Sequence, residues 1–149
     1  MRRAVIYVVF LLAVLGVGLL IGSITRPDGW YATLAKPAFN PPNWVFAPVW
    51  TALYVFIAIA GARTYEGRVR RDLALWVAQM ALNFAWTPAF FGLHQPGLAL
   101  VVILALLVAI LMFIVDRWPA DRVSAVLFMP YAAWVAFASV LNAAIVVLN

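Results

Sequence analysis

Five apolar runs, each long enough to cross a lipid bilayer, constrain this chain more than any other feature of its sequence. A helix rises 1.5 Å per residue, so about 20 residues cross the roughly 30 Å hydrocarbon core. None of the runs contains a formally charged residue. They cover residues 4–24, 44–62, 73–91, 98–115 and 123–148. We therefore predict a single all-α membrane domain over residues 1–149, a bundle of five transmembrane helices.

Composition supports a membrane protein, and the placement of its cations predicts an orientation. Hydrophobic residues make up 68% of the chain, and the mean hydropathy is +1.05. Five crossings put the N-terminus and the loops 63–72 and 116–122 on one side, with all but two of the ten Lys and Arg residues. Arg26 and Lys36, in the 25–43 loop, lie on the other. The positive-inside rule predicts a cytoplasmic N-terminus. The net charge of +5 is thus explained by cations on the cytoplasmic side of a protein embedded in a lipid bilayer. We expect no nucleic-acid partner.

Several chemistries lack the residues that they need. The apolar runs contain no Asp, Glu, Lys, Arg or His, which excludes a proton-coupled antiporter or a charge-relay pump. The chain has no cysteine, so thiolate metal sites and cysteine nucleophiles are excluded. His94 is the only histidine, and we interpret it as a solvated loop residue rather than a haem ligand. We expect no metal and no obligatory cofactor.

Aromatic and polar residues recur at helical spacing on the second, third and fifth runs, so that each group lies within one helix face. Given the predicted orientation, most of them lie between the midplane of the bilayer and its outer surface. The second run contributes Phe46, Trp50 and Tyr54, the third Gln79, Asn83, Trp86 and Phe90, and the fifth Trp134, Ala138 and Asn142.

These three faces predict a shared cavity with aromatic walls. Asn83 and Gln79 would be its buried donors or acceptors, and a flat hydrophobic ligand with few polar groups would fit it. The alternative is that the tryptophans anchor the helices at the membrane interface and that the amides hold helices together. The anchor role suits Trp44, Trp76 and Trp118, which lie near the ends of runs.

The 25–43 loop is predicted to cover this cavity as a lid. Its prolines stiffen it, and Trp30 and Tyr31 follow a turn-like Pro-Asp-Gly sequence. Arg26 and Lys36 are its only cations, and we consider them possible contacts for ligand carboxylates. The alternative is that both cations face solvent or lipid headgroups.

The third run also has a face of small residues, which suits close contact between helices. A homodimer seam is one interpretation of this face, and packing within the monomer is the other. The four residues are Ala74, Ala78, Ala81 and Ala85.

Three sequence blocks resemble the TspO/MBR family, the family of tryptophan-rich sensory proteins and translocator proteins. The first is Trp30-Tyr31 followed by KPxxNPPxWVFxxxWTxLY from Lys36 to Tyr54. The second is QxxLNxxWTPxFFG from Gln79 to Gly92, and the third is PYxxW from Pro130, extending to Leu-Asn at 141–142. The resemblance covers all five runs.

The resemblance implies a five-helix bundle, commonly dimeric, in a bacterial cell membrane. It implies a receptor or sensor for tetrapyrroles such as protoporphyrin IX and haem, with sterols and benzodiazepine-type drugs as further ligands. The alternatives are a tetrapyrrole or sterol carrier and a light- and oxygen-dependent porphyrin-degrading enzyme that would use Trp30 and Trp134. The matching ligand-contacting positions are Trp30, Tyr31, Phe46, Trp50, Asn83, Phe90, Trp134 and Ala138.

Two departures from the family pattern stand out. Phe39 occupies a lid position where many members carry Trp, and no Lys or Arg follows Tyr131, so the sterol motif of animal members is missing there.

Overall fold

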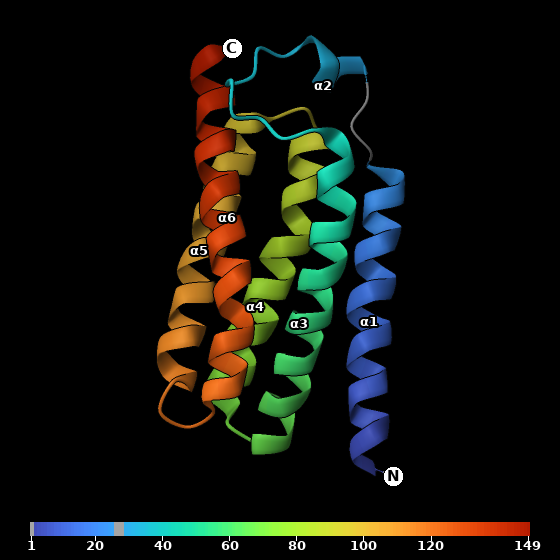
Figure 1. Ribbon diagram of the computed structural model, residues 1–149, viewed down its shortest axis with the longest axis vertical. Helices are drawn as coiled ribbons and strands as arrows, with labels where there is room; N and C mark the ends of the chain where they lie inside the picture. Colours follow the sequence, from blue (N-terminus) through green and yellow to red (C-terminus); the bar gives the residue numbers. More distant parts are fainter. Residues whose placement is uncertain (1, 26–28) are drawn as a thin grey trace.

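A computed structural model describes residues 2–25 and 29–149, and in this part of the chain the fold is entirely helical. Arg26, one of the two predicted carboxylate contacts, lies outside the described residues. Five long helices run side by side along the molecule (Figure 1). They are α1 (Arg2–Ile24), α3 (Phe46–Gly67), α4 (Arg70–Thr87), α5 (Pro96–Arg117) and α6 (Arg122–Leu148). The prediction of an all-α fold is confirmed.

Four of these segments are long and apolar enough to cross a membrane. They are α1, α5, α6 and the continuous Asn43–Gly67 segment, which joins the 3₁₀ turn η1 (Asn43–Val45) to α3. The helix α4 is less apolar than these four segments, because its first turn carries the charged residues Arg70, Arg71 and Asp72. It lies beside the others nonetheless (Figure 1).

The helices extend beyond the predicted apolar runs. The second run ends at Ala62, yet α3 continues to Gly67, and only two residues separate it from α4. Arg68 ends α3 in a left-handed conformation, with φ 57°. The prediction of a 63–72 loop was therefore wrong, because charged residues at a helix end were taken as the start of the loop.

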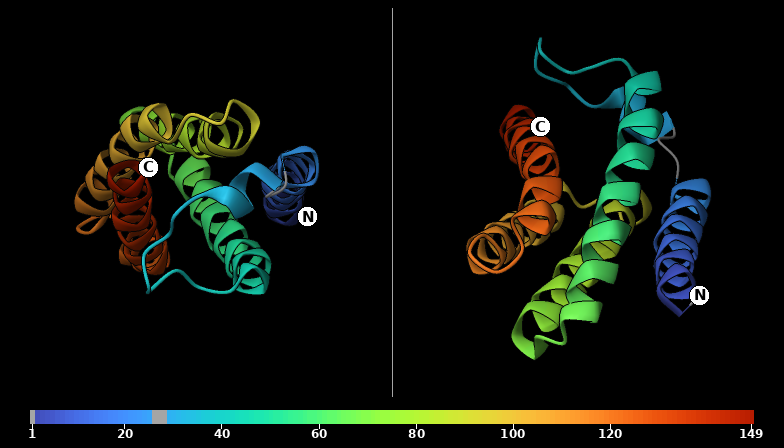
Figure 2. Two further views of the ribbon diagram at one scale, coloured as in Figure 1. Left: turned by 90° about the horizontal axis from the view of Figure 1, so that it is seen from above. Right: turned by 60° about the horizontal axis from the view of Figure 1, so that its bottom comes forward.

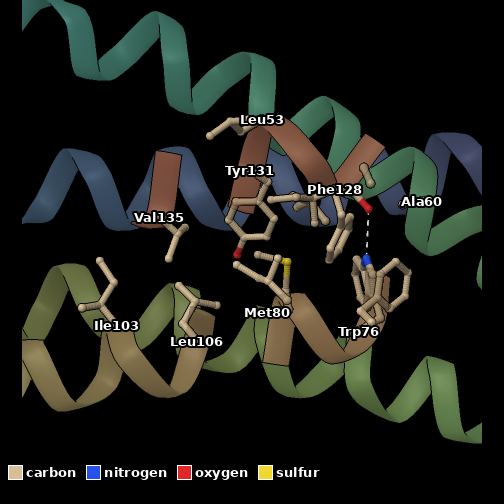
Figure 3. Packing of buried hydrophobic residues seen from close by; sticks show 14 of the residues in the cluster. Leu53, Ala60, Trp76, Met80, Ile103, Leu106, Phe128, Tyr131 and Val135 are labelled. Atoms are coloured by element: carbon tan, nitrogen blue, oxygen red, sulfur yellow. Dashed lines mark hydrogen bonds between the residues drawn. The ribbon is translucent and has the colours of Figure 1, made fainter. Parts of the chain in front are cut away.

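The main hydrophobic core is formed by side chains from all five long helices (Figure 3). Trp76 lies in this core with 8% of its surface exposed, and its indole Nε1–H donates to the carbonyl oxygen of Ile57 at 2.9 Å. Its predicted role as an interfacial anchor is therefore wrong. Trp44 and Trp118, by contrast, remain 74% and 40% exposed.

A cluster of ion pairs joins the helix ends opposite the lid. Arg117 of α5 binds Asp72 of α4 at 2.9 Å, and both side chains are buried. Arg117 also reaches Asp121, which Arg63 of α3 binds at 2.9 Å and to which the Ser124 hydroxyl donates at 2.6 Å. Burial alone would raise the pKa of Asp121, but the hydrogen bonds from Arg63 and Ser124 outweigh it and hold this pKa far below its usual range.

The segment after α1 forms the lid. It contains the short helix α2 (Gly29–Thr33), runs across to the C-terminal end of α6, and returns to the start of α3 (Figures 1 and 2). At Ala35 the lid is clamped by the side chain of Asn149. The Ala35 N–H donates to Asn149 Oδ1 at 3.1 Å, and Asn149 Nδ2 donates to the Ala35 carbonyl at 2.9 Å.

Candidate ligand-binding cavity

A cavity of about 440 Å³ lies at the lid end of the bundle. This volume is in the range of small-molecule sites, roughly 300–1,000 Å³. Its wall is formed by α1, α2, η1, α3, the end of α4 with the turn that follows it, and α6, whereas α5 packs outside against α4 and α6. Eight of the ten predicted ligand contacts line it: Tyr31, Phe46, Trp50, Tyr54, Trp86, Phe90, Trp134 and Ala138.

Aromatic rings in the wall pack against one another, with distances between ring centroids that aromatic pairs prefer. The rings of Phe46 and Trp134 meet edge to face with their centroids 5.8 Å apart, which connects α3 to α6. Trp86 lies 5.4 Å from Phe90, which a π-helical turn, η2 (Pro88–Gly92), directs inward. The helix widens after Thr87, so that Phe90 becomes 2% exposed.

The orientation of Trp86 is determined by a residue from the predicted face of α6. The indole Nε1–H of Trp86 donates to Asn142 Oδ1 at 3.0 Å, and Asn142 Nδ2 donates to the carbonyl oxygen of Pro96 at 2.9 Å. Both ends of the Asn142 amide are therefore occupied. This residue holds the wall in place and also lines the cavity.

Asn83 and Gln79 do not line the cavity, and their predicted role as polar groups in its wall is corrected. They lie beneath it in a buried chain of hydrogen bonds. Tyr54 Oη donates to Asn83 Oδ1 at 3.4 Å, Asn83 Nδ2 donates to Tyr131 Oη at 2.7 Å, and Tyr131 Oη donates to Gln79 Oε1 at 2.8 Å. Buried amides require partners, and here Asn83 bonds to both phenols and Gln79 bonds to that of Tyr131. Tyr131 was missed as a structural partner of these amides.

The two aromatic residues of the lid have different positions. Tyr31 is 5% exposed, lines the cavity and packs edge to face on Phe91 at 5.2 Å. Trp30 does not line the cavity. It stacks on His94 at 4.2 Å with the rings nearly parallel, so it fastens the lid to the α4–α5 connection.

The predicted carboxylate contact Lys36 lies on the lid and outside the cavity lining. Its Nζ donates to the Leu34 carbonyl at 3.1 Å and lies 4.5 Å above the Tyr31 ring. Burial raises the pKa of Tyr31, opposed by its hydrogen bond with Asn40. Tyr31 therefore remains a neutral phenol at neutral pH beneath a lysine ammonium group.

The contribution of α1 was not predicted. Gly18, Leu19, Gly22 and Ser23 of this helix line the cavity, as does Thr25, the residue after its end. The spacing of Gly18 and Gly22, one small residue per turn, was the sequence signal for a close helix contact on this side. Among the described residues, no cluster of three or more His, Asp or Glu side chains offers a metal site.

Comparison with known proteins identifies the family. The sequence profile of the TspO/MBR family matches residues 9–148. The chain belongs to the TspO/MBR family. The tryptophan-rich protein TspO of Archaeoglobus fulgidus is 41% identical over 144 residues, which cover 93% of this chain and 94% of the relative. A tryptophan-rich sensory protein of Cereibacter sphaeroides is 41% identical over 88% of this chain and 84% of its own length. The human translocator protein is 40% identical over 76% of this chain and 70% of its own length.

The resemblance predicted from the three sequence blocks is thus confirmed. With several apolar helices of spanning length, this TspO/MBR protein is an integral multi-pass membrane protein. Its Phe39, the lid residue that departs from the family pattern, is 50% exposed. The centroid of its ring lies 6.1 Å from that of Phe137 on α6.

Proposed function

We propose that this TspO/MBR protein is a membrane receptor or sensor that binds tetrapyrroles, such as protoporphyrin IX or haem, and related flat hydrophobic ligands. The observation that carries the proposal is the cavity, whose wall includes eight aromatic rings from α2, α3, α4, η2 and α6. Such walls offer ring faces and edges to a flat macrocycle. The names of the relatives, which include a sensory protein, support a role in sensing.

The polar groups of the cavity favour a ligand that is apolar over most of its surface. The Thr25 and Thr51 hydroxyls donate to carbonyls of their own helices at 2.6 and 2.7 Å, and the Tyr54 hydroxyl donates to Asn83. These donors are already used. Carboxylates of a tetrapyrrole would therefore lie at the lid end, toward Lys36, and we keep Lys36 and Arg26 as proposed contacts for them.

We expect Trp50→Ala and Trp134→Ala to weaken protoporphyrin IX binding about tenfold or more each, since a tenfold loss corresponds to about 1.4 kcal/mol of lost ring contact. Trp44→Ala is the matched control, because Trp44 is 74% exposed and does not line the cavity. Affinity is measured from the shift of the porphyrin absorption band, which does not depend on tryptophan emission. Equal affinities in all three variants would remove the cavity as the binding site.

The alternative of a porphyrin-degrading enzyme depends on Trp30 and Trp134. Only Trp134 lines the cavity, whereas Trp30 is stacked on His94. We therefore propose binding as the primary function, with carriage through the membrane and photochemical breakdown as secondary candidates. Flux into proteoliposomes and porphyrin loss in light against darkness distinguish them.

We further propose that α4 also crosses the membrane, giving five spans with the N-terminus in the cytoplasm of a bacterial cell. The position of α4 beside the other four helices supports this arrangement (Figure 1). The chain has no cysteine, so single cysteines report topology cleanly. In intact cells, Ala38→Cys in the lid should react with a membrane-impermeant maleimide, and Ala120→Cys should be protected until the cells are opened. The reverse pattern would invert the proposed orientation.

We also propose that two copies associate through the small face of α4. Ala74, Ala78, Ala81 and Ala85 are all exposed, so packing within the monomer does not use this face. Replacing Ala81 with Phe should shift the purified protein from dimer to monomer in light-scattering measurements, because a large side chain prevents close helix contact. Ala133→Phe on α6, another exposed alanine, is the control. A dimer that persists with Ala81→Phe would place the seam elsewhere.

A further inference from the structure

The helices α1 and α3 are in contact at Gly18 and separate one turn closer to the lid, at Gly22. A Cβ atom added to Gly18 would lie 2.5 Å from Cε2 of Tyr54, so the two helices are in close contact there. At Gly22, one turn closer to the lid, an added Cβ would meet nothing within 4 Å. Gly22 nevertheless lines the cavity. The wall between α1 and α3 therefore opens above Gly18.

Among residues 2–25 and 29–149, those that are both exposed and part of the cavity lining all lie at this opening. They are Leu19, Gly22 and Ser23 on α1, and Asn43, Ala47 and Thr51 on η1 and α3. Lining residues from α2, α4, η2 and α6 are buried or half-buried. A residue that faces both the cavity and the surroundings marks a mouth, and we call this group the α1–α3 mouth.

The α1–α3 mouth has one exposed amide, Asn43, at its lid end, and the rest of the mouth is compatible with hydrocarbon. Its hydroxyl groups donate to carbonyls of their own helices, Ser23 to Leu20 at 2.7 Å and Thr51 to Ala47 at 2.7 Å. Such back-bonded hydroxyls do not require water. Both flanking segments, Arg2–Ile24 and Asn43–Gly67, have the length and composition of membrane spans. The mouth thus opens between two spans.

The lid, by contrast, is fastened over the end of the cavity. Asn149 clamps Ala35 through two hydrogen bonds, Trp30 stacks on His94, and Tyr31 is buried against Phe91. Opening the lid requires these contacts to break. The α1–α3 mouth requires no such rearrangement.

We propose that ligands enter and leave the cavity sideways through the α1–α3 mouth, directly from the bilayer. The inference rests on the proposed function, and it narrows the substrate class to molecules that first dissolve in the hydrocarbon of the membrane. The missing side chain of Gly22 and the small methyl group of Ala47 keep this route open. The lid then retains the ligand and does not admit it.

The test uses protein reconstituted in phosphatidylcholine vesicles that carry protoporphyrin IX, with binding followed by stopped-flow quenching of tryptophan emission. Gly22→Leu and Ala47→Leu narrow the mouth. We expect both to slow association about fivefold or more and to slow dissociation as well, because a narrowed passage hinders movement in both directions. Gly16→Leu is the matched control, since Gly16 also has nothing within 4 Å of an added Cβ and does not line the cavity.

A lid variant separates the two routes. Asn149→Ala removes the clamp on Ala35 and should leave the association rate unchanged. Faster association in Asn149→Ala, unchanged rates in Gly22→Leu and Ala47→Leu, or a weaker Kd produced by faster dissociation alone would each overturn the sideways route. Wild-type protein that binds no protoporphyrin would instead overturn the proposed function, so the two failures are distinguishable.

Discussion

Asp72→Ala is expected to lower the free energy of unfolding by about 3–5 kcal/mol, the usual cost of removing one partner from a buried ion pair. Asp72 is the closest carboxylate to the Arg117 guanidinium, at 2.9 Å, and Arg117 is 4% exposed. Its Nε atom has no partner among the described residues. Without Asp72, the carboxylate left beside the guanidinium in the described part of the chain is that of Asp121, at 3.4 Å, which is shared with Arg63. The measurement is unfolding by SDS in mixed micelles.

Asp116→Ala provides the matched control, because it removes an aspartate from an ion pair that joins the same two helices. Its partner Arg71 is exposed, so water replaces the lost contact, and we expect little change in stability. If both variants unfold alike, burial does not set the strength of the Asp72–Arg117 pair. Asp72→Asn adds a further test, since it keeps the shape and one acceptor while it removes the charge.

Gly61→Leu is expected to cost about 1–3 kcal/mol or more, because overpacking forces neighbouring side chains off their preferred positions. A Cβ atom at this position would lie 2.5 Å from Cε2 and 2.7 Å from Nε1 of Trp76. The indole cannot move away without losing its hydrogen bond to the Ile57 carbonyl. The expected signs are a lower unfolding temperature and a red shift of the emission from the displaced tryptophan.

Gly16→Leu again serves as the control, because an added Cβ there meets nothing within 4 Å. Leucine also has a higher helix propensity than glycine, so this variant should be at least as stable as the wild type. A Gly61→Leu protein with wild-type stability would mean that α3 and α4 separate without cost, which the buried contact of Trp76 with Gly61 argues against.

The aromatic faces of the cavity were predictable because helical spacing alone places residues four apart on one side. Phe46, Trp50 and Tyr54 follow that spacing, and all three line the cavity. Asn83 follows the same spacing rule on α4, but its partner Tyr131 is 48 residues away. Periodicity predicts which way a side chain faces, and it does not predict what meets it there.

Charge patterns were less informative about the interior. An apolar-run criterion ends each span at the first charged residue, so Arg63, Asp72 and Arg117 were assigned to loops. They lie instead on helices, in a buried or half-buried cluster at the helix ends. Pairing allows this, because a charge that is costly to bury alone is tolerated beside an opposite charge with good hydrogen-bond geometry.

The all-α class, the approximate extent of the apolar helices, the family, and the aromatic faces that meet in the cavity were all predictable from the order of residues. These features follow from local composition, spacing and motif order along the chain. Three features became visible once the helices were seen packed together: Asn83 and Gln79 lie beneath the cavity, Trp76 packs on Gly61, and α1 and α3 separate above Gly18. Each of these depends on where two distant helices approach each other. That distance is set by the packing of all five long helices together.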